Sequence, residues 1–265
     1  MAVDRTLRDR LQDRVNQAAA ASSPESIELL LRETAKPVLF ALAQNPRLEE
    51  PDLLRLLQRK DLAAEVVREL ANHRHALGNY NVQLALARHP RTPRMVSLPI
   101  LKFLYLFDLL RVAQTPGVPS DVRSAAEETI LKKIAGLPRG DQISLARRGT
   151  GRLAAALLMG GDIEVIRAAL DNPHVTEAQL LKVLASAGVP PGAVGLISEH
   201  RRWSHFYGLR LALIRSPHTP LARVLRFLPE MTVPDLRDIC LDRRLPTHVR
   251  NYVAAHCQSR LTKSR

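Results

Sequence analysis

Apolar residues recur along this chain at the three- and four-residue spacing of amphipathic helices. In 51–58, Leu53, Leu54 and Leu57 form one apolar stripe, and an equivalent stripe recurs in 178–185. No stretch of useful length alternates apolar and polar residues as a half-buried strand would. The pattern therefore predicts an all-α chain of about fifteen to eighteen short helices.

The chain repeats itself at an offset of 127 residues. His73 and Tyr80 are matched by His200 and Tyr207 at this offset. About two dozen positions are identical over the ungapped alignment, which is the signature of a long internal repeat. We therefore predict a tandem duplication. Its two repeat modules are 38–130 and 165–257.

Each predicted module contains shorter units marked by proline. Pro46 and Pro90 lie 44 residues apart, as do Pro173 and Pro217, a spacing typical of helical-pair repeats. Because proline disfavours the α conformation in the residue before it, a helix is expected to end near each of these positions. We predict a right-handed α-solenoid of the HEAT or armadillo type, in which each helix pair buries its apolar stripe against its neighbours.

Three threonines are predicted to start helices. Thr92 and Thr219 each precede a proline, and Thr176 precedes an acidic residue, so all three fit the N-cap position. The Gly-, Pro- and Arg-rich stretch 135–152 is predicted to join the two modules. It is not expected to separate domains, and the whole chain, 1–265, is interpreted as one solenoid domain.

Composition supports helix packing and adds a strong positive charge. Aromatic residues make up only 4% of the chain, which argues against a sandwich or barrel. The 39 basic and 26 acidic residues give a net charge of +13. From residue 172 onward there are 14 basic and 6 acidic residues, so most of the excess lies in the last third. The charge indicates a partner that carries carboxylates or phosphates, although an arginine-rich genome explains it equally well.

The phrases around the prolines resemble those of bacterial HEAT-like and leucine-rich-repeat-variant proteins. The resemblance rests on "NPxxxExxLL", on "xPxTP" and on recurring Val-Arg pairs, and it extends from about Pro37 to Leu261. It implies a helical-repeat fold and says almost nothing about activity. Some leucine-rich-repeat-variant proteins hold an iron–sulfur cluster on N-terminal cysteines. This sequence has no cysteine there, so no cofactor is expected.

The best candidates for binding lie in the duplicated phrase His-Arg…Tyr. Arginine beside tryptophan and tyrosine is common at protein interfaces and at sites that grip phosphates or stack bases. A structural role in the turn between helices is the favoured interpretation of the matched residues, because a repeat needs it at equivalent positions of both copies. The Arg202–Trp203 pair occurs only in the second copy, which favours a binding role there. The candidates are His73, Arg74, Tyr80, His200, Arg201, Arg202, Trp203, Tyr207 and Arg210.

Other polar residues are interpreted as structural. Asp108 and Asp235 fit helix starts, where a carboxylate favours the helix dipole, and Arg123 and Arg250 are expected to brace neighbouring helices. The histidines and the two cysteines show no metal-ligand or disulfide spacing. We therefore predict neither a catalytic site nor a metal site.

The sequence also predicts where the protein works. No secretory signal is visible, and the most apolar run, Leu98–Leu110, is too short to span a bilayer and contains Lys102 and Asp108. A cytoplasmic protein without membrane contact is expected.

Two classes of function fit these observations. The first is a non-enzymatic scaffold that binds an acidic macromolecule, in first place a protein. The alternative is a protein that binds the phosphate backbone of a nucleic acid, related in architecture to the HEAT-like alkylpurine DNA glycosylases, whose active-site constellation cannot be placed on this sequence. A third class, a repeat-type enzyme such as a chromophore lyase, has no specific support in the sequence.

Overall fold

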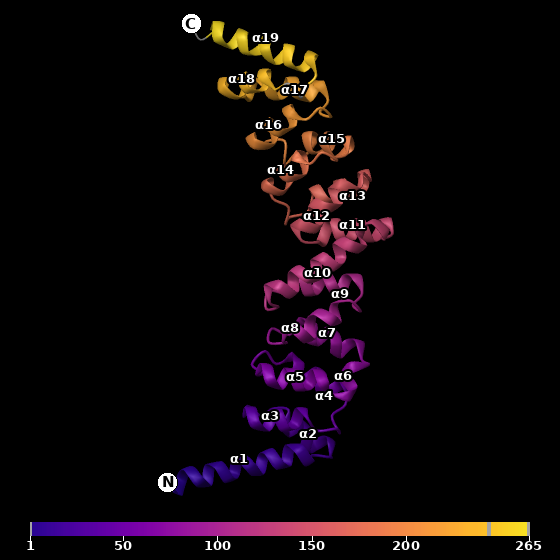
Figure 1. Ribbon diagram of the computed structural model, residues 1–265, viewed down its shortest axis with the longest axis vertical. Coiled ribbons are helices and arrows are strands. Elements are labelled where there is room, and N and C mark those ends of the chain that lie inside the picture. The colour runs from indigo at the N-terminus through magenta and orange to yellow at the C-terminus, as the bar shows by residue number, and fades with distance from the viewer. Residues whose placement is uncertain (1, 243–244, 264–265) are drawn as a thin grey trace. The chain divides into compact units, whose positions relative to one another are not determined.

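The fold is entirely helical in the part of the chain that the computed structural model describes, residues 2–242 and 245–263. These residues form nineteen α-helices and three 3-10 helices, and they contain no strand (Figure 1). The predicted all-α class is confirmed. The number of helices slightly exceeds the prediction, partly because the His-Arg phrase itself forms a one-turn helix, α6 (Arg74–Leu77).

The chain divides into two compact units, Met1–Ile130 and Leu131–Arg265. The division falls within α10 (Ser120–Lys133). The stretch 135–152, predicted as a join, is largely helical and contains α11 (Arg139–Arg148). That the two repeat modules form one continuous solenoid domain stays a prediction.

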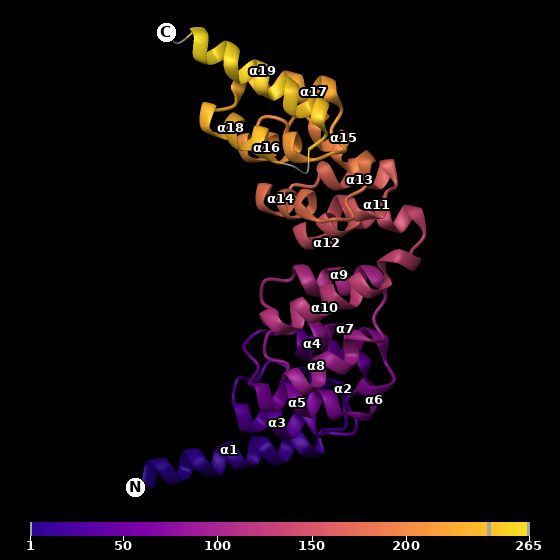
Figure 2. The same ribbon diagram turned by 45° about the horizontal axis from the view of Figure 1, so that its top comes forward.

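The first unit stacks short helices in two layers (Figure 2). Besides α6 and most of α10, its helices are α1 (Ala2–Ala20), α2 (Pro24–Leu30), α3 (Lys36–Ala43), α4 (Glu50–Gln58), α5 (Ala64–Asn72), α7 (Tyr80–Arg88), α8 (Arg94–Leu101) and α9 (Leu106–Gln114). Helices α1, α3 and α5 pack in succession, and so do α4, α7 and α9. Helix α4 is buried between the layers through Leu53, Leu56 and Leu57. Of the predicted stripe, Leu53 and Leu57 are buried and Leu54 is half-buried, because the inner face of the helix is turned toward Leu56.

The second unit is built in the same way. Besides α11, its helices are α12 (Gly151–Leu157), α13 (Ile163–Leu170), α14 (Glu177–Ala185), α15 (Pro191–Glu199), α16 (Tyr207–Arg215), α17 (Leu221–Phe227), α18 (Val233–Leu241) and α19 (Thr247–Lys263). Its 3-10 helices are η1 (Ile134–Gly136), η2 (Leu158–Gly160) and η3 (Leu228–Glu230). Helices α11, α13 and α15 form one layer, and α12, α14, α16 and α18 form the other, with α19 packed along α18.

The predicted helix ends near proline are largely correct, but two of the three predicted N-cap threonines do not cap a helix. Helices α7 and α16 end two residues before Pro90 and Pro217, and Thr176 caps α14 with a capping box. Thr92 and Thr219 are not N-caps, because the proline after each threonine occupies the N-cap position. Each hydroxyl instead donates a 2.6 Å hydrogen bond to a carbonyl oxygen in the last turn of the preceding helix. These threonines therefore close a helix rather than open one.

Over the described residues, none of the helices combines the length and apolar character that crossing a bilayer requires.

Candidate functional site

In each unit, the tyrosine of the repeated His-Arg…Tyr sequence joins one helix to the next through hydrogen bonds. The Tyr80 hydroxyl donates to Asp108 Oδ2 at 2.6 Å and accepts the backbone N–H of Tyr105 at 3.0 Å. This bond links the first residue of α7 to the first turn of α9. Tyr207 repeats the arrangement between α16 and α18: it donates to the Asp235 carboxylate and accepts the Thr232 N–H.

The ionisation of these groups suits a structural bond. Burial and the hydrogen bond to Asp108 raise the pKa of Tyr80, so its phenol stays protonated and donates. Hydrogen bonds from the Thr232 and Tyr207 hydroxyls lower the pKa of Asp235, so its carboxylate stays ionised and accepts. Both aspartates lie in a first helical turn, as predicted. Together, each pair stabilises the packing of successive helices.

The histidine of the His-Arg…Tyr sequence has a different hydrogen-bond partner in each unit. His73 is buried, and its Nε2 lies 3.1 Å from the Asn45 carbonyl oxygen. His200 is half-buried, and its Nε2 lies 3.1 Å from Asp171 Oδ1. In the second copy the carbonyl of Asn172, the counterpart of Asn45, accepts from Arg202 instead. Through these hydrogen bonds, both histidines connect the turn in which they lie to the preceding helix pair.

The Arg202–Trp203 pair also belongs to the packing of the second unit. Trp203 is 1% exposed, and its indole N–H donates to the Leu170 carbonyl at 2.9 Å. The Arg202 guanidinium lies 4.1 Å from the Trp203 ring centre and donates to the carbonyls of Asn172 and Val175. The indole therefore lies in the core rather than on a surface that a partner can touch. The expectation of a direct contact through Trp203 is revised for this reason.

The remaining predicted arginines differ in whether their side chains form intramolecular polar contacts. Arg210 is engaged by the Ser204 carbonyl and the Glu230 carboxylate, and its guanidinium lies near the Phe227 ring. Arg74 is exposed and donates to the neighbouring His75 ring. Arg201 is exposed and forms no hydrogen bond or ion pair with any described residue. Of the nine predicted site residues, Arg201 is thus the one without an intramolecular polar contact, again among the described residues.

Groups suited to metal chemistry do not converge in the described part of the chain. No three histidine, cysteine, aspartate or glutamate side chains there lie together as metal ligands would. Both cysteines are free thiols, Cys240 partly exposed and Cys257 buried. Arg123 and Arg250, matched at the 127-residue offset, each bury Nε with no hydrogen-bond partner among the described residues, and their bracing role stays a prediction.

Two buried histidines should make the first unit sensitive to acid. Burial lowers the pKa of His73 and His89 below the ordinary 6.5, so both are neutral in the fold and gain protons on unfolding. The first unit is therefore expected to lose stability as pH falls below 6.5. Urea unfolding followed by circular dichroism at neutral and mildly acidic pH checks this. Trp203, the single tryptophan, reports only on the second unit.

A matched pair of variants isolates the cause of this acid sensitivity. His89→Ser introduces the residue found at the equivalent position of the second unit, Ser216, and should reduce the pH dependence seen by circular dichroism. His205→Asn, at an exposed position, should leave it unchanged. An acid-induced transition of equal size in both variants would contradict the assignment to buried histidines.

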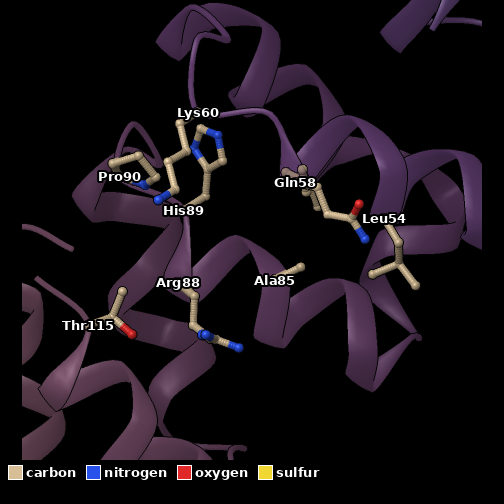
Figure 3. Close-up of a pocket in the computed structure, with 9 residues that line it drawn as sticks. Leu54, Gln58, Lys60, Ala85, Arg88, His89, Pro90 and Thr115 are labelled. Carbon is tan, nitrogen blue, oxygen red and sulfur yellow. The ribbon is translucent and has the colours of Figure 1, made fainter. Parts of the chain in front are cut away.

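A groove between α4 and α7 is the most site-like feature of the first unit. It has a volume of about 390 Å³, with Leu54 and Gln58 on one side and Ala85 and Arg88 on the other (Figure 3). Two amphipathic helices produce it because their short or apolar residues face each other across the exposed side of the layer. The remaining lining residues are Leu57, Lys60, His89, Pro90 and Thr115.

The second unit has a groove at the equivalent place. It lies between α14 and α16 and has a volume of about 760 Å³. Every residue that lines the first groove has its counterpart 127 positions later in the lining of the second. Five of these positions carry identical residues in both grooves: Leu54 and Leu181, Leu57 and Leu184, Ala85 and Ala212, Arg88 and Arg215, Pro90 and Pro217.

The charge of the first groove is entirely positive. Lys60 and Arg88 are exposed at its edge, and neither forms a hydrogen bond or ion pair with a residue that the structure describes. No aspartate or glutamate lines the groove. An apolar floor with two unpaired cations favours a ligand that combines carboxylates or phosphates with apolar groups.

Sequence reasoning did not single out the groove residues. The predicted residues were those of the His-Arg…Tyr sequences and the Arg202–Trp203 pair, and most of their side chains hold turns or pack helices in the structure. A usable signal was present, because Arg88 and Arg215 are identical at the 127-residue offset and end equivalent helices. Both arginines lie in the last turn of their helix, where a cation favours the helix dipole, and both also line a groove.

No protein-family model, curated protein or solved structure matches this chain.

Proposed function

We propose that this protein is a non-enzymatic helical-repeat scaffold that binds an acidic segment of a protein partner in its two equivalent grooves. The observation that carries the proposal is the recurrence of one groove, residue for residue, in both units. Core packing alone requires the buried face of each helix to recur. It does not require the same exposed arginine beside the same apolar floor.

We further propose that the two units arose by duplication of a HEAT-like module and wind in a right-handed superhelix. Equivalent hydrogen bonds support the duplication: the Tyr80–Asp108 and Tyr207–Asp235 pairs lie 127 residues apart. So do the bonds from the hydroxyls of Thr92 and Thr219 to the carbonyls of Leu86 and Leu213. Repeats of this kind expose long surfaces, which suits a docking function.

An acidic polypeptide fits the grooves through charge and shape together. Arginine binds carboxylates in bidentate geometry, and clustered cations speed the encounter with an acidic partner. The apolar floor formed by Leu54, Leu57 and Ala85 offers contact area for the side chains between the carboxylates. Each groove lies along two helices and is open to solvent, as a peptide segment requires.

Reversing the charge of the first groove is expected to weaken binding about tenfold or more, because two attractive contacts become repulsive. The probe is a displayed library of random short peptides, selected on the full chain and expected to become enriched in aspartate and glutamate. Lys60→Glu with Arg88→Glu should lower the affinity of the enriched peptides, measured by fluorescence anisotropy.

The matched control changes the net charge equally outside the groove. Arg47→Glu with Arg68→Glu alters two exposed arginines that line none of the described grooves, and affinity should change less than about twofold. Equal losses of affinity in both double variants would show that the net charge of the chain, and not the groove, explains the binding. Selection that yields no peptide, or peptides without acidic bias, would overturn the proposal.

The nucleic-acid alternative predicts a different outcome in a parallel measurement. Phosphate-backbone binding would appear as affinity for DNA or RNA that falls steeply with salt and is lost in the Lys60→Glu, Arg88→Glu variant. Salt-dependent binding of that kind, without acidic peptides in the selection, would favour the alternative over a protein partner.

A further inference from the structure

The groove of the second unit has about twice the volume of its counterpart in the first. The volumes are about 760 Å³ and about 390 Å³. Three lining side chains are smaller in the second groove: Ala185 stands in place of Gln58, Ala187 in place of Lys60, and Ser216 in place of His89. The lining also contains Gly208, where a side chain would approach Glu177 Oε1 to 2.8 Å from Cβ. The second groove is therefore wider at these positions and can accept a larger side chain.

Ser216 places in the lining of this groove a hydroxyl that is unsatisfied by the described residues. It is 8% exposed, it lines the groove, and its Oγ is buried without a hydrogen-bond partner among the described residues. The equivalent His89 satisfies both ring nitrogens, with the Arg59 carbonyl and the Arg91 N–H. A buried hydroxyl without a partner is unfavourable, so a ligand that offers an acceptor there would gain from it.

The apolar surface continues beyond this groove along the same layer of helices. A second hollow of about 510 Å³ lies between α12 and α14 and shares Ser186 with the first. Its floor includes Ala155, Ala156 and Met159, the last a flexible side chain that adapts to different ligands.

The edges of these two hollows are mostly basic. Arg152, Lys182 and Arg215 are the cations among the lining residues, and Asp242 is the one carboxylate. His218 also lines the edge beside Arg215. An occupant with apolar groups inside and carboxylates at the rim matches this arrangement, which is the complement of an amphipathic acidic segment.

We propose that the groove between α14 and α16 holds a bulky apolar side chain of the partner's acidic segment. A carboxylate beside that side chain is bound by Arg215 and by the Ser216 hydroxyl. The two grooves then have different specificities. The first binds carboxylates of the segment through Lys60 and Arg88, and the second selects an apolar side chain by its size. This inference rests on the proposed function and adds the chemical identity of the segment.

The test makes the second groove resemble the first. Ala185→Gln with Ala187→Lys introduces the residues of the first unit at two exposed positions, where the fold should tolerate them. Peptides selected on the unaltered chain should carry leucine, isoleucine, phenylalanine or methionine close to an acidic residue. Replacing that apolar residue with alanine should weaken binding about tenfold to the unaltered chain and less than about twofold to the double variant.

Two further variants complete the design. Ala178→Gln with Ala222→Lys makes the same chemical change at exposed positions outside the described grooves and should leave the selectivity intact. Ser216→Ala should lower the affinity for the peptides at least about threefold, since a charge-assisted hydrogen bond is lost. Circular dichroism of each variant checks that the fold is retained.

The outcomes separate this inference from the proposed function. Acidic peptides without an apolar preference, or a preference that survives in Ala185→Gln, Ala187→Lys, would overturn the inference and leave the scaffold proposal standing. A selection that enriches no acidic peptide at all would overturn both.

Discussion

Replacing Trp203 with alanine is expected to lower the free energy of unfolding of the second unit by about 3–5 kcal/mol. The indole is 1% exposed, so its removal leaves a large cavity among the helices of this unit. The Leu170 carbonyl also loses the indole N–H as its donor. Urea unfolding followed by circular dichroism measures the loss, since the variant has no tryptophan left to report by fluorescence.

Two controls separate the cavity from the hydrogen bond. Trp203→Phe keeps part of the ring volume and removes the N–H, so its cost should be well below that of Trp203→Ala. Phe206→Ala removes a partly exposed ring that packs on Trp203 at 5.6 Å between ring centres, and it should cost least. An alanine variant of Trp203 as stable as the parent would contradict the core assignment.

This expectation matters for experiments on binding. Arg201, Arg202 and Trp203 are adjacent in sequence, but the structure assigns them to different environments: Arg201 is exposed, and Trp203 is a core residue. A variant that changes all three would lose a partner through unfolding as readily as through a lost contact. Substitutions at Lys60, Arg88 and Arg215 avoid this problem because these side chains are exposed.

The helical fold was predictable because it depends on local and periodic signals. Leucines at helical spacing predicted helix α4 and two of its three buried leucines, and prolines predicted the ends of α7 and α16. Thr92 and Thr219 were misassigned because the same residue type can cap the helix that follows or close the helix that precedes. Only the three-dimensional path of the turn decides between the two, and it brings each hydroxyl back to a carbonyl of the preceding helix.

The candidate site was less predictable because it depends on which faces remain uncovered. The most apolar run of the sequence contains Phe103 and Tyr105, yet both are 71% exposed in the turn between α8 and α9. Conversely, Trp203 was predicted to contact a partner and lies in the core. Hydrophobic character alone does not tell an inner face from an outer one when every helix is short and packs on two neighbours.

The 127-residue offset carries information on both the core and the surface. In the core it pairs residues with a clear packing role, such as Asn45 and Asn172. On the surface it pairs Arg88 with Arg215, which line equivalent positions of the two grooves. Comparing the two units residue by residue therefore distinguishes structural identities from those that we attribute to binding.

Replacing Asn172 with alanine is expected to destabilise the second unit by about 3 kcal/mol, because two buried carbonyls and one partly buried N–H lose their partner. The side-chain amide donates to the carbonyls of Ala146 and Gly149 at 2.7 and 3.0 Å, and its oxygen accepts the His174 N–H at 2.8 Å. Asn172 is fully buried, so water cannot replace these bonds. Urea unfolding followed by Trp203 fluorescence measures the effect.

The same change in the first unit provides the matched experiment. Asn45 donates to the carbonyls of Ala18 and Ala21 at 2.9 and 2.8 Å and accepts the Arg47 N–H at 2.9 Å. Asn45→Ala should therefore cost about as much, with the loss visible by circular dichroism and with little change in Trp203 fluorescence. Asn251→Ala, at an exposed position, should change neither signal by more than about 0.5 kcal/mol. A large difference between Asn45→Ala and Asn172→Ala would show that these two equivalent bridges do not carry equal weight, and it would weaken the case that the units descend from one module.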